Sequence, residues 1–298
     1  MSLGILVSYV EDTNREQQLV DALIEQGSPV VWDSGAFSVF TGKATITPED
    51  HARWVLDQPV RPNLRFVGLD VIGDSVATLE NYRTQRAMGA VVEPTIHYGD
   101  PVEQVRLLLD VADTDWLNIG GLVPHLRGSR NLRHVAAFIA AVRRSCPPEV
   151  RIHALGCTTP TVLRTVQVDA VDSSSWLAGQ RYRQLSLFDS VRGRWLQFDL
   201  GSSSTARRLE AWAGAHQRAA WLRSEYGVSP TELIERAGDS HFVLSLAIEA
   251  TGHLAEWVSR LHGKDLTVYL AGSDPSTARH DSLLRHLRAT TTTPLEGP

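Results

Sequence analysis

Short apolar runs alternate with longer amphipathic stretches between Ile5 and Val171. The runs are rich in β-branched residues and are bounded by glycine, proline or aspartate, which is typical of buried strands. We expect seven strands, at Ile5–Tyr9, Val30–Trp32, Leu64–Leu69, Val91–His97, Trp116–Ile119, Arg151–Leu155 and Asp169–Val171. Because strands that alternate with helices usually form a parallel sheet, this pattern predicts an α/β fold.

The stretches between these runs carry helix start and stop signals. Thr47-Pro48 and Thr159-Pro160 each place a capping residue before a proline, which suits the first helical position. Gly27 and Gly89 follow the ends of two such stretches. We therefore expect helices at Asn14–Gln26, from Thr47, at Asp74–Met88, from Asp100, at Ser129–Ser145 and from Thr159.

An eighth strand would close a TIM-type (β/α)8 barrel, and two segments compete for that place. Arg194–Leu200 and Leu266–Leu270 both have strand character, and the sequence does not choose between them. The chain between them is amphipathic and predicts helices, at Thr205–Glu225, Pro230–Arg236 and Ser240–Leu261. We expect a barrel core in residues 1–200, a C-terminal helical extension in residues 201–289 and a disordered tail in residues 290–298.

The composition is that of an ordinary globular protein, with 298 residues of which 43% are hydrophobic and 21% charged. No run approaches the roughly 20 apolar residues that a membrane helix needs, and the N-terminus lacks the basic start of a signal peptide. We therefore expect a soluble, cytoplasmic protein without membrane contact. Cys146 and Cys157 cannot form a disulfide framework, and Cys157 near His153 does not complete a zinc site.

The net charge of −5 weighs against a surface that binds nucleic acid throughout. Between Trp176 and Arg208, however, basic residues outnumber acidic ones. This stretch includes Arg181, Arg183, Arg192 and Arg194. A solvated arginine-rich loop explains such a stretch as well as a phosphate-binding surface does, so charge alone leaves both interpretations open.

Chemically useful residues follow the ends of the expected strands. They are Asp33, Asp70, His97, the Gly120-Gly121-Leu122 turn, Gly156 and Asp172. In a TIM-type barrel the carboxyl ends of the strands share one face, where the active site lies. The pattern therefore predicts that six segments converge on one pocket. Each residue also has a simpler explanation, because an aspartate can accept hydrogen bonds within its own turn and a histidine can be buried in the core.

Other catalytic patterns are missing from the sequence. It contains no HExxH helix, no CxxC pair, no G-x-S-x-G elbow, no Walker loop and no dinucleotide fingerprint. What remains is carboxylate chemistry, and the pair Asp33 and Asp172 at two strand ends favours chemistry at a sugar carbon.

Four short motifs follow one another along the chain. They are Asp33-Ser34-Gly35-Ala36-Phe37, Gly120-Gly121-Leu122, Leu155-Gly156 and Val171-Asp172. This ordered set resembles the motifs of the tRNA-guanine transglycosylase superfamily, over about half of the chain. The form Asp172-Ser173-Ser174-Ser175-Trp176, followed by Arg181-Tyr182-Arg183, looks closer to the phage and bacterial relatives that insert 7-deazaguanines into DNA.

The resemblance implies a (β/α)8 barrel and a pentosyltransferase that exchanges guanine for a 7-deazaguanine base through a covalent enzyme–nucleotide intermediate. It gives Asp172 the place of the nucleophile and Asp33 that of the acid/base. The base-binding positions would be Asp70, His97, Gly121, Leu122, Leu155 and Phe37. The phosphate groups would contact Arg181, Arg183, Arg192 and Arg194. This exchange chemistry requires no cofactor, and the sequence offers no metal-ligand pattern for the site. The resemblance suggests a homodimer.

Two departures from the family pattern favour DNA over tRNA as the nucleic-acid partner. Ala36 stands where the tRNA enzymes have a second glycine, and the cysteine-rich zinc subdomain that supports tRNA binding is missing. His97 stands where the family usually has a glutamine. Three alternatives remain open: a tRNA enzyme, a transglycosylase or nucleosidase acting on free nucleosides or nucleotides, and a catalytically silent nucleic-acid-binding relative.

Overall fold

Two compact units make up the part of the chain that the computed structural model describes, residues 2–201 and 203–272. The first unit comprises residues 2–173 and 258–272. The second comprises residues 174–201 and 203–257. The expected tail at residues 290–298 lies outside the described residues, as does the end of the expected extension.

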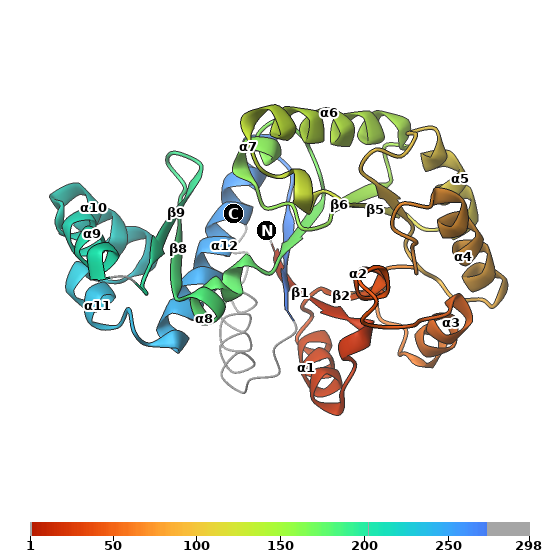
Figure 1. The fold of residues 1–298 in the computed structure, drawn as a ribbon, viewed down its shortest axis with the longest axis horizontal. Helices are drawn as coiled ribbons and strands as arrows, with labels where there is room; N and C mark the ends of the chain where they lie inside the picture. Colours follow the sequence, from red (N-terminus) through yellow and green to blue (C-terminus); the bar gives the residue numbers. More distant parts are fainter. Residues whose placement is uncertain (1, 202, 273–298) are drawn as a thin grey trace, which may run out of the picture. The chain divides into compact units, whose positions relative to one another are not determined.

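Eight parallel strands form the sheet of the first unit (Figure 1), in the order β3-β2-β1-β10-β7-β6-β5-β4. They are β1 (Ser2–Ser8), β2 (Val30–Asp33), β3 (Leu64–Phe66), β4 (Thr95–His97), β5 (Trp116–Gly120), β6 (Arg151–Ala154), β7 (Ala170–Ser173) and β10 (Thr267–Ala271). The seven expected strands are all present, and the α/β fold with a parallel sheet is confirmed.

The eighth strand of the sheet is β10, which pairs in parallel with both β1 and β7. Its central residues Val268, Tyr269 and Leu270 are buried, as a strand covered on both faces requires. The competing segment forms β9 (Arg194–Asp199), which pairs antiparallel with β8 (Gln184–Asp189) in the second unit. Most positions of β9 are partly or fully exposed, which suits a hairpin better than the centre of a parallel sheet.

Contacts between strands that are not neighbours show that the sheet is strongly curled. Arg65 of the edge strand β3 donates from Nη1 to both carboxylate oxygens of Glu93, at 2.7 and 2.8 Å. Its Nη2 donates to the hydroxyl of Tyr269 in β10, at 2.9 Å. Glu93 precedes β4, the other edge strand, and forms an isolated parallel bridge with Val67. The fold is therefore TIM-like, with an eight-stranded parallel sheet whose edges approach each other.

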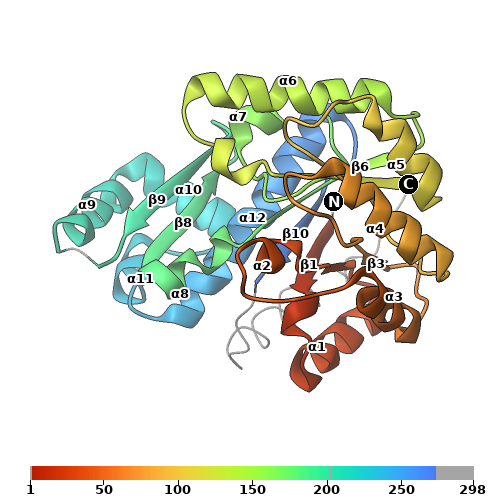
Figure 2. The same cartoon turned by 45° about the vertical axis from the view of Figure 1, so that its right-hand side comes forward.

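Helices alternate with the strands of the first unit (Figures 1 and 2). They are α1 (Asn14–Glu25), α2 (Ala36–Phe40), α3 (Pro48–Asp57), α4 (Ser75–Ala87), α5 (Gln104–Ala112), α6 (Ser129–Ser145) and α7 (Pro160–Leu163). The hydroxyl of Thr47 accepts from the amide of Asp50, and Asp74 caps α4 in the same way. The helix expected from Asp100 begins only at Gln104, because the Asp100 side chain accepts from the amide of His97 and holds a turn there.

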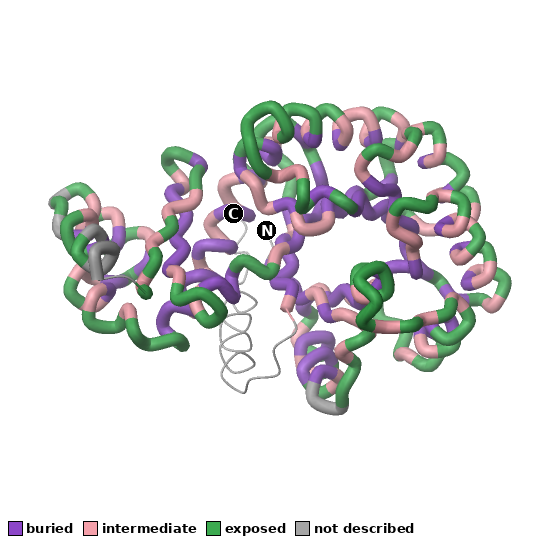
Figure 3. Tube along the Cα trace, in the orientation of Figure 1, coloured by how far each residue is buried: buried purple, intermediate pink, exposed green. Residues whose placement is uncertain are grey.

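Burial follows the strands of the first unit (Figure 3). Ile5, Val31, Ile96, Ile119 and Ile152 are completely buried. Each lies on a strand that packs against helices on one face and faces the inside of the curled sheet on the other. This double burial explains why the strands appear in the sequence as short, nearly continuous apolar runs.

The second unit combines the β8–β9 hairpin with helices. They are α8 (Ala178–Tyr182), α9 (Ser203–Gly214), α10 (His216–Tyr226), α11 (Pro230–Glu235) and α12 (Ser240–His262), of which α12 ends in the first unit. The single helix expected at Thr205–Glu225 is divided in two, because Ala215 has an extended conformation. Among the described residues, no helix is both long and apolar enough to cross a membrane.

Candidate active site

Three aspartates meet at the carboxyl ends of the strands of the first unit. Asp33 ends β2, Asp70 follows β3, and Asp172 lies in β7. The negative charges of Asp70 and Asp172 both act on the carboxyl group of Asp33, which places the three groups around one region. The ends of β2 and β7 are separated by β1 and β10, roughly 14 Å along a sheet with 4.8 Å between strands, and the curl shortens this separation.

Asp33 is held in the turn that leads from β2 into α2. Its Oδ2 accepts a hydrogen bond from the amide of Gly35 at 3.0 Å. Gly35 has φ = 79°, and a Cβ there would lie 2.8 Å from Cγ1 of Val10, so this turn requires glycine. The pKa of Asp33 is raised to about 7, first by burial and then by the charge of Asp70, with a smaller contribution from Asp172. At neutral pH this carboxyl group can therefore both donate and accept a proton.

Asp172 is oriented by two donors from β6 and the turn that follows it. Its Oδ1 accepts from the amide of Gly156 at 2.9 Å and lies 3.1 Å from Nε2 of His153. His153 is completely buried, its ring stacks on Tyr269, and its Nδ1 has no hydrogen-bond partner among the described residues. A buried bare nitrogen costs less than a buried N–H, so we assign the proton to Nε2, which donates to Asp172.

Both of these hydrogen bonds fall on the same oxygen of Asp172. Within the described part of the chain, no hydrogen bond reaches its Oδ2. The carboxylate is therefore fixed by one oxygen and can use the other for attack on an electrophile.

Asp70 forms a second carboxylate–histidine pair. Its Oδ2 lies 2.8 Å from Nε2 of His97, which ends β4, and both side chains are almost completely buried. Burial alone would lower the pKa of His97, but the hydrogen bond and charge of Asp70, together with Asp100, raise it above its usual value. A protonated His97 would neutralise Asp70 and hold it in one orientation.

The glycine turn after β5 lies against this second pair. A Cβ on Gly120 would be 3.0 Å from Cδ2 of His97, and Gly121 has φ = 69°. Leu122 is completely buried, whereas Leu155, which follows β6, is partly exposed. Of these two base-binding candidates, only Leu155 presents surface to solvent, because Leu122 is buried together with its backbone.

Phe37 lies on the short helix α2, directly after the turn that holds Asp33, and 65% of its surface is exposed. An exposed aromatic ring at the edge of a carboxylate site is a suitable surface for stacking a planar base. The sequence did not indicate α2 as a helix.

The four candidate phosphate-binding arginines belong to the second unit. Arg181 lies in α8, Arg183 follows it, Arg194 begins β9, and Arg192 forms an ion pair with Asp189. The Arg192–Asp189 contact is internal to that unit.

His153 is the residue whose role sequence reasoning missed, because it was considered only as a metal ligand. The signal was present, since a polar residue in the middle of the apolar strand Arg151–Ala154 needs a partner when buried. Cys157 lies nearby, but burial raises the pKa of its thiol to about 12, so it stays protonated. Among the described residues, no group of three or more His, Cys, Asp or Glu side chains is arranged to hold a metal ion.

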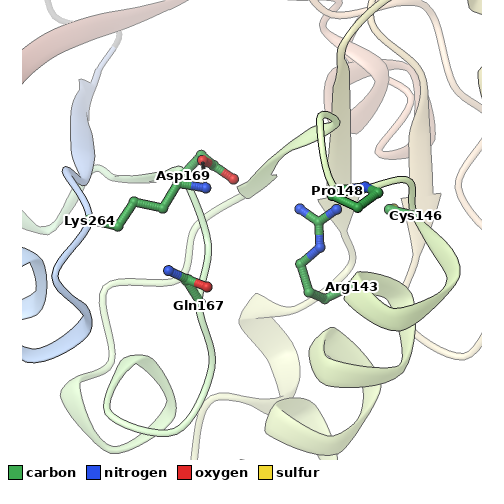
Figure 4. A pocket seen from close by; sticks show the side chains of 6 residues that line it. All are labelled: Arg143, Cys146, Pro148, Gln167, Asp169 and Lys264. Carbon is green, nitrogen blue, oxygen red and sulfur yellow. Dashed lines mark ion pairs between the residues drawn. The ribbon is translucent and has the colours of Figure 1, made fainter.

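Cavities at the amino ends of the strands are separate from this site. One, of about 320 Å³, is lined by Arg143, Cys146, Pro148, Gln167, Asp169 and Lys264 (Figure 4). Both basic side chains that line it already have partners. Lys264 forms an ion pair with Asp169, and Arg143 donates to the carbonyls of Pro147 and Val150. Another, of about 380 Å³, lies beside Arg65 and Trp116.

Comparison with protein-family models and with curated protein sequences finds no match to this chain.

Proposed function

We propose that this protein is a base-exchange pentosyltransferase, which replaces guanine by a 7-deazaguanine base in a nucleic acid through a covalent aspartyl-nucleotide intermediate. The observation that carries the proposal is the difference between two carboxyl groups that share one region. Asp172 is held by two donors on one oxygen, whereas Asp33 has one amide donor and a pKa raised to about 7. One nucleophile and one proton donor are what glycosyl transfer with retention requires.

In the first step, Oδ2 of Asp172 attacks C1′ of the nucleotide as the bond from C1′ to the guanine nitrogen breaks. The electron pair of that bond leaves with guanine, and the proton of the Asp33 carboxyl group neutralises the departing base. Asp33 becomes a carboxylate, and Asp172 becomes an ester with the sugar.

In the second step, the incoming base attacks C1′ from the opposite face and displaces Asp172. Its ring N–H proton passes to Asp33, which returns to the protonated form. Two inversions give net retention, and no oxidant, reductant or cofactor takes part. A 7-deazaguanine lacks the basic N7 that helps guanine to leave, so the product is less easily reversed.

Asp70 and His97 support recognition of the base. A carboxylate whose one oxygen is held by His97 can use its other lone pairs to accept from the ring N–H and amino group of a guanine edge. Phe37 and Leu155 offer exposed apolar surface for the faces of the ring.

The resemblance to the tRNA-guanine transglycosylase superfamily, closest to its DNA-modifying members, is part of this proposal. The curled parallel sheet supports it, because bridge Val67–Glu93 and the Arg65–Glu93 pair join the two sheet edges as a closed (β/α)8 barrel would. DNA is the preferred partner in the proposal, with tRNA as the alternative. A target base within a duplex would have to leave the stack before reaching Asp172.

The test is incorporation of labelled guanine into DNA, tRNA and free nucleotides offered in parallel. Labelled guanine is the probe because its exchange does not depend on the 7-substituent of the natural base. We expect labelled DNA with the unaltered protein and a loss of at least roughly 10³-fold with Asp172→Ala, since removal of a nucleophile has effects of this size. Without added base, the unaltered protein should form an adduct with DNA that survives denaturation.

Asp57→Asn is the control, because Asp57 is exposed at the end of α3. It should retain exchange. Unchanged incorporation by Asp172→Ala, or an adduct formed by Asp172→Asn, would contradict the proposal. Label in nucleotides alone would instead identify an enzyme of free nucleotides.

A further inference from the structure

A long stretch of the first unit carries positive charge without any acid. Residues 116–148 contain no Asp or Glu, although the whole chain has a net charge of −5. The stretch covers β5, the loop after it and α6. Its middle contains Arg127, Arg130 and Arg133, together with His125 and His134.

The three arginines are exposed, and their guanidinium groups have no partner among the described residues. Arg127, Arg130 and Arg133 form no ion pair or side-chain hydrogen bond with any residue that the structure describes. Arg65 and Arg86 of the same unit, by contrast, bind Glu93 and Asp113. No acid of the adjacent helix α5 reaches the three arginines either, since its Asp110 forms no ion pair with α6.

The loop that carries Arg127 is fixed to the aspartate site by two contacts. The ring of His125 stacks on Tyr98, which follows His97, with 4.5 Å between ring centroids. Val123 lies against Gly156, where a Cβ would overlap its Cγ2. Gly156 is the residue whose amide donates to Asp172.

Arg130 and Arg133 extend this surface onto the first turns of α6. Residues three apart in a helix lie on the same face, with Cβ atoms roughly 5–6 Å apart. Together with Arg127 they form a cationic surface, which we define as Arg127, Arg130 and Arg133. It begins in the loop whose Val123 lies against Gly156.

We infer that this cationic surface binds the phosphate backbone of the nucleic acid next to the target nucleotide. The inference rests on the proposed function, and it names a phosphate-binding surface within the first unit. Guanidinium groups bind phosphate through two parallel hydrogen bonds, and unpaired arginines need not break an ion pair to do so. The surface lies within the unit that holds Asp172, so it can position the strand directly.

The test measures binding and does not depend on exchange. A fluorescently labelled single-stranded DNA is titrated with the protein at salt concentrations from about 0.05 to about 0.5 M. Salt weakens phosphate contacts over this range. Each phosphate contact to a single strand contributes about 0.7 to the slope of log affinity against log salt. The triple variant Arg127→Ala/Arg130→Ala/Arg133→Ala should lower the steepness of this slope by about 2, so that a tenfold rise in salt weakens its binding roughly 100-fold less than it weakens that of the unaltered protein.

The matched control is Arg61→Ala/Arg83→Ala/Arg144→Ala, which removes three exposed charges outside the cationic surface, before β3, on α4 and in the last turn of α6. It should leave the slope unchanged, and thermal unfolding should show that both variants are folded. An RNA of the same sequence forms the second arm, and an equal loss for both polymers is expected from backbone contacts.

An unchanged slope in the triple variant, or an equal loss in the control, would overturn the inference. These outcomes separate it from the proposed function. If exchange is absent but the slope falls by about 2, the surface stands and the exchange assignment fails. If Asp172→Ala abolishes exchange while the triple variant keeps the slope of the unaltered protein, the exchange assignment stands and the cationic surface does not bind phosphate.

Discussion

Replacement of Asp33 by asparagine removes a proton that the folded protein retains up to about neutral pH. The pKa of Asp33 is raised from 3.8 to about 7 in the folded protein. Between these values the folded protein holds the proton and the unfolded chain has lost it. The stability contributed by the protonated group is therefore present below pH 4, decreases as the pH rises toward 7 and is constant above that value.

The size of the effect follows from the shift. About 3 pKa units correspond to roughly 4 kcal/mol at 1.36 kcal/mol per unit. The Asp33 side chain is partly accessible to water, which screens the charges of Asp70 and Asp172, so we expect about 2 kcal/mol. Asparagine keeps the shape but cannot ionise, so the Asp33→Asn protein should lack this loss.

The assay is urea unfolding at pH 5 and at pH 8 for the unaltered protein, for Asp33→Asn and for the surface control Asp57→Asn. His97, whose pKa is also raised, contributes less to the stability of the folded protein as the pH rises. This loss is the same in all three proteins and cancels in the comparison. The assay samples only the part of the shift between pH 5 and pH 7, so the unaltered protein and Asp57→Asn should lose about 1 kcal/mol more than Asp33→Asn between the two pH values. The same pH dependence in all three proteins would refute the raised pKa of Asp33.

Two further substitutions test the support of Asp172. His153→Leu removes one donor and should lower kcat for exchange by roughly 10- to 100-fold with little change in KM. In His153→Gln the amide can still donate, so this variant should retain most of the kcat of the unaltered protein. Equal losses of kcat in both variants would show that His153 only fills space. Gly156→Ala should cost about 1–3 kcal/mol in urea unfolding, because the Cβ would overlap Val123 at a φ of 69°. Adding Val123→Ala should recover only the part due to overlap, and full recovery would argue against backbone strain.

The elements of the fold could be predicted because each depends on local sequence. Apolar runs such as Val30–Trp32 and caps such as Thr47 act within a few residues, and the structure places them where expected. The choice of β10 over β9 could not be predicted, because both segments have strand character and only long-range pairing distinguishes them. Ala215, which divides one expected helix, carries no breaker signal of its own.

The candidate site shows the same division. Asp33, Asp70, His97 and Asp172 could be placed at strand ends from the pattern alone. Their pairing could not, because the His97–Asp70 contact joins the two edges of the sheet and depends on how far it curls, and the His153–Asp172 contact depends on the register of β6 and β7. The exposure of Phe37 depends on α2, which is too short for a periodic signal.

Three ionised carboxyl groups in one buried region would repel one another strongly, and each of the three has different hydrogen-bond partners. Asp172 receives two hydrogen bonds and Asp70 is paired with His97, whose pKa is raised, whereas Asp33 has a single amide donor and keeps its proton up to about pH 7. Environments that separate the proton affinities of neighbouring carboxyl groups assign them different roles in catalysis. In the proposed reaction the roles of Asp33 and Asp172 are therefore not interchangeable: the nucleophile is the carboxyl group that two donors hold by one oxygen, and the acid is the carboxyl group whose raised pKa keeps its proton up to about pH 7.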